Sequence, residues 1–213
     1  MSKLDFSALL CSRLCHDLVS PVGAINNGLE LLAGEQDETM RDAVFDLIEK
    51  STQQTSNKLQ FFRLAFGAAG GFSTHLDTRE AEKSLRAFLA GSKVDLVWNV
   101  SANELTKGGV KLLLNLSLVA AEALIRGGTL TVQFGPADGE TVNIAILAEG
   151  ERVIFSDEVC AAVQGKAEEE DLEPRLAPAY LASIVAAELG GKVEVVQQAS
   201  QKLEIVAPIK ALG

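Results

Sequence analysis

The sequence predicts two parts of different fold class, an α-helical hairpin over residues 1–70 and an α/β sandwich over residues 72–213. Apolar residues recur every three or four positions through the first 66 residues, which is the period of one face of a helix. From residue 94 onward, several segments alternate with the two-residue period of a strand. The cluster Gly67-Ala68-Ala69-Gly70-Gly71 separates the two patterns and indicates a linker.

The first helix is expected over residues 4–33, where Ala33-Gly34 supplies a glycine stop. Its apolar stripe consists of Leu10, Leu14, Leu18, either Val22 or Pro21, Ile25, Leu29 and Leu32. A second periodic run, from Met40 to Phe66, predicts an antiparallel partner helix. Two helices alone cannot bury stripes of this length, so the hairpin is predicted to dimerise into a four-helix bundle. The alternative, in which the hairpin packs on the second part of its own chain, stays open.

The second part alternates between helical and strand periodicity. Strand patterns cover residues 94–100, 130–134, 142–146, 193–195 and 203–205, and helical patterns cover residues 78–90, 107–126 and 174–189. This order predicts an α/β sandwich with the helices on one face of a mixed sheet.

Composition excludes several classes of partner and location. The net charge of -10 argues against nucleic acid or an anionic membrane as the main partner, because both carry phosphate. No cationic segment followed by an apolar one opens the chain, so no secretory signal is expected. The apolar stretch 110–125 is interrupted by polar and charged side chains, and no membrane span is expected there. We therefore expect a soluble, cytoplasmic protein.

The chain has three cysteines, an odd number that does not suggest a disulfide framework. Cys11 and Cys15 lie four residues apart on the first helix, and we expect them to be small buried residues beside the apolar stripe. A metal or redox pair is the alternative, although a metal would need more ligands than these cysteines and one histidine supply.

The segment His16-Asp17-Leu18-Val19-Ser20-Pro21 is the strongest candidate for chemistry. On a helix whose apolar stripe includes Leu14 and Leu18, the side chain of His16 points to the opposite side, toward solvent. A surface histidine without function is the alternative, and His75 is interpreted as incidental. The face around His16 is predicted to be small and polar, open to close approach by another protein, and holds Ser12, Arg13, Ser20, Gly23 and Asn27.

A phospho-accepting imidazole needs one free nitrogen as the nucleophile and a partner that sets the proton on the other. Asp17 adjoins His16 and could orient the ring or take up its proton, and Arg13 could neutralise the incoming phosphoryl oxygens. The transfer depends on positioning and charge neutralisation, which a rigid helix favours. Pro21 removes a backbone hydrogen bond to Asp17 and is expected to bend or loosen the helix beside the site.

The same six residues, His16 to Pro21, resemble the H-box of sensor histidine kinases, whose dimerisation and histidine-phosphotransfer domain is a helical-hairpin dimer. Residues 72–213 resemble the kinase ATP-binding domain in the order and spacing of their elements. The nucleotide motifs of that domain are incomplete in this sequence. Asn115 is retained, but the kinase asparagine that binds magnesium is replaced by Val119, the adenine-reading motif is altered at Ala148 and Arg152, and no glycine remains in the later loop at residues 176–181.

A kinase-like dimer that keeps its histidine and lacks an ATP site resembles the ChpT-type histidine phosphotransferases of alphaproteobacterial phosphorelays. The resemblance implies that His16 accepts a phosphoryl group from the receiver domain of a hybrid, CckA-like kinase and passes it to CtrA-like and CpdR-like response regulators of the cell cycle. It implies no cofactor or metal bound by this chain, with Mg²⁺ supplied by the partner receiver domain. The residues implied to bind the receiver are Ser12, Val19, Ser20, Gly23 and Asn27.

Three alternatives stay open. The chain could be a non-catalytic dimeric module that only binds receivers, or a divergent kinase that phosphorylates itself from ATP. It could also be a phosphatase, because Ser20 lies four residues after His16, where kinases of this kind often carry a residue that orients water.

Overall fold

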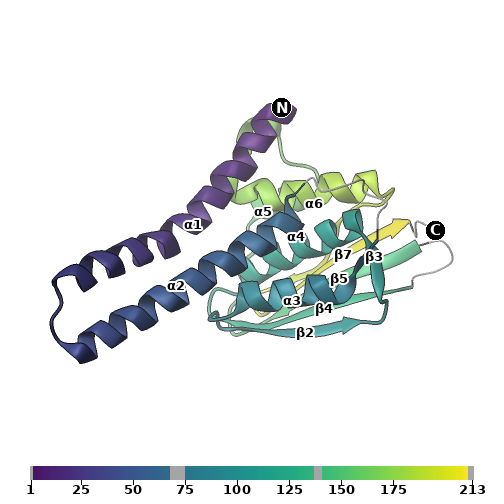
Figure 1. Ribbon diagram of the computed structural model, residues 1–213. Coiled ribbons are helices and arrows are strands. Elements are labelled where there is room, and N and C mark those ends of the chain that lie inside the picture. Colours follow the sequence, from purple (N-terminus) through teal and green to yellow (C-terminus); the bar gives the residue numbers. More distant parts are fainter. Residues whose placement is uncertain (1, 68–74, 137–140, 211–213) are drawn as a thin grey trace.

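The computed structural model describes residues 2–67, 75–136 and 141–210, and all structural statements refer to these ranges (Figure 1). Its α-helices and strands are α1 (Lys3–Gly34), α2 (Glu38–Ala65), β1 (His75–Asp77), α3 (Thr78–Leu89), β2 (Val94–Val100), β3 (Glu104–Thr106), α4 (Lys107–Ala123), β4 (Gly128–Pro136), β5 (Thr141–Glu149), α5 (Asp157–Val163), α6 (Ala177–Glu188), β6 (Glu194–Ala199) and β7 (Lys202–Lys210). Two short 3-10 helices, η1 (Glu169–Asp171) and η2 (Pro174–Leu176), precede α6.

The predicted helical hairpin is confirmed, and both of its helices begin at a polar cap. Ser2 and Asp5 form a capping box at the start of α1, in which each side chain bonds the backbone N–H of the other. Asp37 caps α2 by accepting a hydrogen bond from the backbone of Met40 at 2.9 Å. The turn that joins the helices lies at the far end of the molecule from the sheet, so half of the hairpin projects from the body (Figure 1).

The second part is the predicted sandwich. Its five-stranded sheet has the order β2-β4-β5-β7-β6, and β2 and β4 are parallel while the other neighbours are antiparallel. The helices α3, α4 and α6 cover one face of this sheet (Figure 1). Burial on β7 alternates along the strand, as a sheet with a single covered face requires. The sheet is therefore mixed, with its helices on one side, as the sequence predicts.

Three elements were missed by the periodicity. The helix α5 is only seven residues long, and it begins at Ser156, whose hydroxyl accepts from the backbone of Val159. The strands β1 and β3 pair antiparallel over three residues each, too few to show a period. Of the predicted linker, residues 68–71 lie outside the described residues, as does the predicted boundary between residues 70 and 72.

One hydrophobic core joins the end of the hairpin to the sandwich. The side chains of Phe61 and Phe62, near the end of α2, are fully buried in the same cluster as the inward residues of α4 and the sheet. Phe61 stacks on Phe88 of α3, with ring centroids 4.1 Å apart. At the start of α1, Phe6 meets Tyr180 of α6 edge to face at 5.5 Å. The alternative that the hairpin packs on its own second part is thus correct for this end of it.

The other end of the hairpin keeps apolar side chains in solvent. The exposed ones on the projecting half include Val22, Leu29, Leu31, Met40 and Phe45. Burial of such side chains stabilises a protein by about 1.5–3 kcal/mol each, so a cluster of this size left in water is unfavourable. The single chain therefore leaves part of the predicted stripes without a partner.

Length and composition alone would let α1 cross a membrane, since its residues from Leu4 to Gly34 include a sufficiently apolar window. Core helices of soluble proteins meet the same criterion. In this chain the first half of α1 contacts α6 through Phe6 and carries Arg13, which is ion-paired with a residue of α4. The predicted apolar stretch 110–125, by contrast, is the buried helix α4 and the turn after it.

Candidate functional site

His16 lies on the outer surface of α1, with 86% of its side chain exposed to solvent. The predicted exposure of this histidine is therefore confirmed. Ser12, Val19, Ser20 and Asn27 are also exposed, and Gly23 is partly so. A Cβ atom added at Gly23 would meet no other atom within 4 Å, so the surface beside His16 is open.

Asp17 contacts the imidazole directly. Its Oδ1 lies 3.3 Å from Nδ1 of His16. An ionised carboxylate can only accept hydrogen bonds, so this contact favours the tautomer with the proton on Nδ1 and a free lone pair on Nε2. The second oxygen of the same carboxylate, Oδ2, accepts a hydrogen bond from Nε of Arg13 at 2.9 Å. Each oxygen of Asp17 therefore has a different partner, and together they fix the plane of the carboxylate.

Arg13 does not lie on the exposed face with His16, and that prediction is wrong. Only 8% of the surface of Arg13 is exposed to solvent, and its guanidinium forms an ion pair with Glu122 of α4. It also donates to the backbone carbonyl of Arg175 at 3.4 Å. Burial tends to lower the pKa of this guanidinium, but Glu122 and Asp17 outweigh it and hold that pKa above its usual value. Arg13 is thus a permanent buried cation, held between two helices.

Pro21 has the predicted effect on the backbone hydrogen bonds at Asp17. Proline has no N–H, so the carbonyl of Asp17 lacks the helical partner it would find four residues later. Lys58 of α2 supplies a replacement, since its Nζ donates to that carbonyl at 2.8 Å. The helix α1 continues through Pro21 without a break. The second helix of the hairpin therefore stabilises the turn that carries His16.

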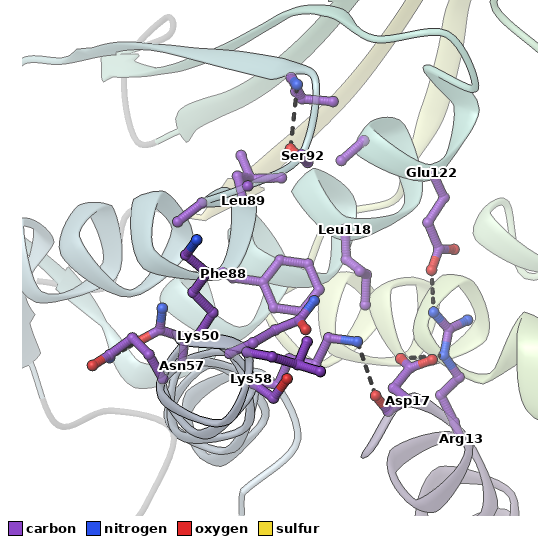
Figure 2. Close-up of a pocket in the computed structure, with 18 residues that line it drawn as sticks. Arg13, Asp17, Lys50, Asn57, Lys58, Phe88, Leu89, Ser92, Leu118 and Glu122 are labelled. Carbon is purple, nitrogen blue, oxygen red and sulfur yellow. Dashed lines mark hydrogen bonds and ion pairs between the residues drawn. The ribbon is translucent and has the colours of Figure 1, made fainter. Parts of the chain in front are cut away.

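A cleft of ≈ 750 Å³ separates the hairpin from the sandwich beside this cluster. Arg13 and Asp17 line it from α1, Lys50 and Lys58 from α2, and Glu122 from α4 (Figure 2). In Figure 2 the dashed contacts run from Lys58 to Asp17, from Asp17 to Arg13 and from Arg13 to Glu122. His16 is not among the lining residues of the cleft. The carboxylate that orients the histidine therefore faces the interior, while the ring faces solvent.

Most of the positions that resemble the kinase nucleotide motifs in the sequence lie in the hydrophobic core, but Arg152 is exposed. Val119 and Ala148 are buried, as are Ala179 and Leu181 at the start of α6. Asn115 is fully buried, and its amide donates to the carbonyls of Ala65 and Lys111, both at 2.8 Å. This side chain therefore holds the end of α2 against α4.

Two of the three cysteines are placed differently from the expectation. Cys11 and Cys15 were expected to be buried beside the stripe, but both are exposed in the single chain. Among the described residues, none covers these two side chains. Within the described residues, no group of three or more histidine, cysteine, aspartate or glutamate side chains is arranged to hold a metal ion. His75, interpreted as incidental, is exposed at the start of β1.

Sequence reasoning missed two residues that complete the site. Lys58 was overlooked, although the carbonyl left free by Pro21 already implied that a donor was needed near Asp17. Glu122 is the only acidic residue of α4 and comes directly after the buried run 112–121, so a cationic partner close to it could have been expected. That its partner is Arg13, 109 positions away, could not be deduced from one sequence.

Three comparisons with known proteins bear on this site. Residues 78–201 match the family model described as the histidine phosphotransferase C-terminal domain. The protein phosphotransferase ChpT of Brucella abortus (strain 2308) is 38% identical over 195 residues, which cover 92% of this chain and 91% of that protein. A solved bacterial phosphotransferase at 1.7 Å aligns with a TM-score of 0.84 and 34% identity over 97% of both chains.

The similarity in sequence and fold over nearly the whole chain defines the class as a protein phosphotransferase. By the match of its second part and its similarity over the whole length, the chain belongs to the histidine phosphotransferase family. The predicted resemblance and the predicted phosphotransferase activity are thereby confirmed.

Proposed function

We propose that this protein carries a phosphoryl group on Nε2 of His16 between the aspartates of receiver domains, and that it does so without ATP. The observation that carries this proposal is the geometry of His16. Its ring is exposed on a surface of small side chains, while its Nδ1 is 3.3 Å from a carboxylate oxygen of Asp17. Such a histidine is a ready nucleophile that another protein can reach.

The proposed step is an in-line displacement on phosphorus. The lone pair of Nε2 forms the new N–P bond as the bond between phosphorus and the aspartyl oxygen of the donor receiver breaks. The electron pair of that bond stays on the receiver, which regains its carboxylate. The proton of His16 remains on Nδ1, where Asp17 accepts its hydrogen bond and stabilises the positive charge of the phosphorylated ring. Transfer to the next receiver is the same step in reverse.

The core supports a receiver, and not ATP, as the donor. Val119, Ala148 and Leu181 stand where the kinases that the sequence resembles have nucleotide-binding residues. Their side chains are buried among other apolar residues. A polyphosphate at these positions would have to displace packed core, at a cost of several kcal/mol. The amide nitrogen of Asn115 donates to two backbone carbonyls and so already has a structural role.

The partners follow from the resemblance to ChpT-type phosphotransferases. The donor would be the receiver domain of a CckA-like hybrid kinase, and the acceptors would be CtrA-like and CpdR-like response regulators in the cytoplasm. Mg²⁺ would come with the acidic pocket of each receiver. The docking surface would include Ser12, Val19, Ser20, Gly23 and Asn27, all beside His16 on α1.

We further propose that the working form is a homodimer joined through one face of the hairpin. On α1 the residues Leu4, Cys11, Cys15, Val22 and Leu29 follow each other at spacings of seven, four, seven and seven, so they share one side of the helix. On α2, Phe45 and Leu59 lie two heptads apart, on the side opposite Lys50, which faces the cleft. We call these seven residues the outer apolar face.

All seven residues of the outer apolar face are exposed in the single chain. A second copy of the hairpin, packed face to face, would bury them in a four-helix bundle. It would also cover Cys11 and Cys15, which the single chain leaves in solvent. His16 lies on a different side of α1 and would remain accessible in the dimer.

The test is transfer of label from a phosphorylated receiver. A receiver domain labelled with ³²P at its aspartate is mixed with the wild-type chain in Mg²⁺ and no nucleotide, and the same is done with His16→Ala. We expect the wild-type chain alone to take up label. Labelling of His16→Ala, or uptake by the wild type only after ATP is added, would contradict the proposal.

A further inference from the structure

The structure holds a line of four polar side chains that runs from the sandwich to the reactive surface. Glu122 of α4 pairs with Arg13 of α1, Arg13 donates to Asp17, and Asp17 contacts His16. Figure 2 shows the first three of these residues in line at the edge of the cleft, with Glu122 reaching down from α4 (Figure 2). The line joins two parts of the chain that are more than 100 residues apart in sequence.

Arg13 can couple the position of Glu122 to the position of Asp17, because its guanidinium is rigid. The group is planar and its five N–H donors have fixed directions, so a partner on one edge sets where the other edge points. Nη2 is held by Glu122 and Nη1 by the carbonyl of Arg175, which leaves Nε directed at Asp17. Both of these anchors belong to the second part of the chain.

Because Arg13 is buried, its guanidinium requires a carboxylate partner. Arg13 is 8% exposed, and a buried guanidinium without a carboxylate partner is strongly unfavourable. Glu122 is the only acidic residue of α4. Asp17, the other carboxylate that contacts Arg13, also contacts Nδ1 of His16. If Glu122 were neutral, Arg13 would draw Asp17 toward itself as its sole anionic partner, and away from the imidazole.

We propose that Glu122 is a positioning residue for phosphoryl transfer at His16, because it anchors Arg13 and so keeps Oδ1 of Asp17 on Nδ1 of the ring. The inference rests on the proposed function and assigns the second part of the chain a role in the transfer step itself. Glu122 does not touch the phosphoryl group. It acts through the tautomer and the orientation of His16.

The experiment compares Glu122→Gln with the wild type and with Glu151→Gln. The control removes a carboxylate that pairs with Arg126 on the exposed surface at 2.7 Å and that is not part of the line. Three quantities are measured on the full-length chain: the single-turnover rate of transfer from a phosphorylated receiver, the Kd for the unphosphorylated receiver, and the ¹⁵N chemical shifts of the two ring nitrogens of His16.

We expect Glu122→Gln to slow transfer about tenfold, since misplacement of a supporting group commonly costs at least that much. The Kd should stay within about twofold, and the ring shifts should move toward a mixture of tautomers. Asp17→Asn combined with Glu122→Gln should be no slower than Asp17→Asn alone, because both act on the same contact. Glu151→Gln should match the wild type in all three quantities.

The inference is overturned if Glu122→Gln transfers at the wild-type rate, if its entire loss is a weaker Kd, or if the ring shifts do not change. Should Glu122→Gln fail to give a folded chain by circular dichroism, Glu122→Asp replaces it, with the same expectations and the same contradicting results. These outcomes are separate from failure of the proposed function, in which the wild-type chain itself would accept no label.

Discussion

At the scale of single residues, the reactivity of this protein depends on the two carboxylate oxygens of Asp17, which contact different side chains. One accepts from Arg13 at 2.9 Å and the other lies 3.3 Å from His16. The first contact is charged on both sides and shorter, so Arg13 holds the carboxylate while the second contact selects the tautomer of the ring. The ring itself is free of other partners that the structure shows, and it is exposed.

Asp17→Asn should separate these two roles. The amide is close in shape to the carboxylate but can turn an N–H toward the ring, so it no longer favours the proton on Nδ1. We expect transfer to slow by about 10²-fold, since loss of the correct tautomer is costly wherever histidine acts as nucleophile or base. Single-turnover rates give the loss, and ¹⁵N shifts of His16 report the tautomer.

Ser12→Ala serves as the control for Asp17→Asn, since this exposed side chain lies near His16 but has no contact with the ring that the structure shows. It should leave the ring shifts unchanged, whatever it does to docking. Wild-type ring shifts in Asp17→Asn would mean that the carboxylate does not set the tautomer.

At this scale the sequence was informative only where the partners are close along the chain. His16, Asp17 and Pro21 lie within six positions, so helical spacing alone could predict the exposed ring, the carboxylate beside it and the missing hydrogen bond. Arg13 was placed on the wrong face, because its direction depends on Glu122 in another helix. A contact across 109 positions leaves no periodic signal in one sequence.

At the scale of elements, α1 and α2 depend on each other at the level of His16. A helix with an internal proline loses one hydrogen bond and is destabilised by about 3 kcal/mol or more. Here the free carbonyl of Asp17 is bound by Lys58 at 2.8 Å, which recovers part of that loss. The periodicity predicted both helices and their antiparallel packing, but not this contact, since a lysine on a helix face is usually solvated.

A double-mutant cycle between Lys58 and Pro21 tests this dependence. Lys58→Met should lower the free energy of unfolding by about 1 kcal/mol in the wild-type background, the value of one hydrogen bond. In the Pro21→Ala background the backbone N–H of the new alanine can satisfy the carbonyl of Asp17, so the same substitution should cost close to nothing. Urea unfolding of the four proteins gives the coupling energy.

Equal costs of Lys58→Met in the two backgrounds would show that Lys58 stabilises the hairpin by some other contact. Lys50→Met is the matched control, because Lys50 lies on α2 and lines the same cleft, but Figure 2 shows no hydrogen bond between it and Asp17. Its effect on the free energy of unfolding should be small and the same with and without Pro21.

At the scale of the whole molecule, the hairpin has two different environments along its length. Its end near the sandwich is buried through Phe61 and Phe62, and its projecting half leaves apolar residues in solvent. The sequence predicted stripes along both helices but left open whether the sandwich or a second copy covers them. The structure shows that the sandwich covers the inner side of the hairpin end near it. The outer apolar face, which extends along α1 from Leu4 to Leu29, stays exposed, and we assign it to the dimer.

Val22→Glu should therefore shift the protein from dimer to monomer, since it places a charge within the outer apolar face. The control is Leu31→Glu, which changes an exposed leucine on the opposite side of the same helix. Light scattering after size exclusion gives the mass of each. The chain has a mass of 22.6 kDa, so the wild type and Leu31→Glu should elute at twice this value and Val22→Glu at once. A monomeric wild type at micromolar concentration would contradict the dimer.

The central claim is that His16 is a relay point between two aspartates. The most direct measurement is a chase: the chain is labelled by one phosphorylated receiver, purified free of that receiver and of any nucleotide, and mixed with a second receiver and Mg²⁺. We predict that the acid-labile, alkali-stable label of phosphohistidine leaves His16 and appears as alkali-labile label on the second receiver. Label that stays on the chain or is released only as inorganic phosphate would contradict the claim.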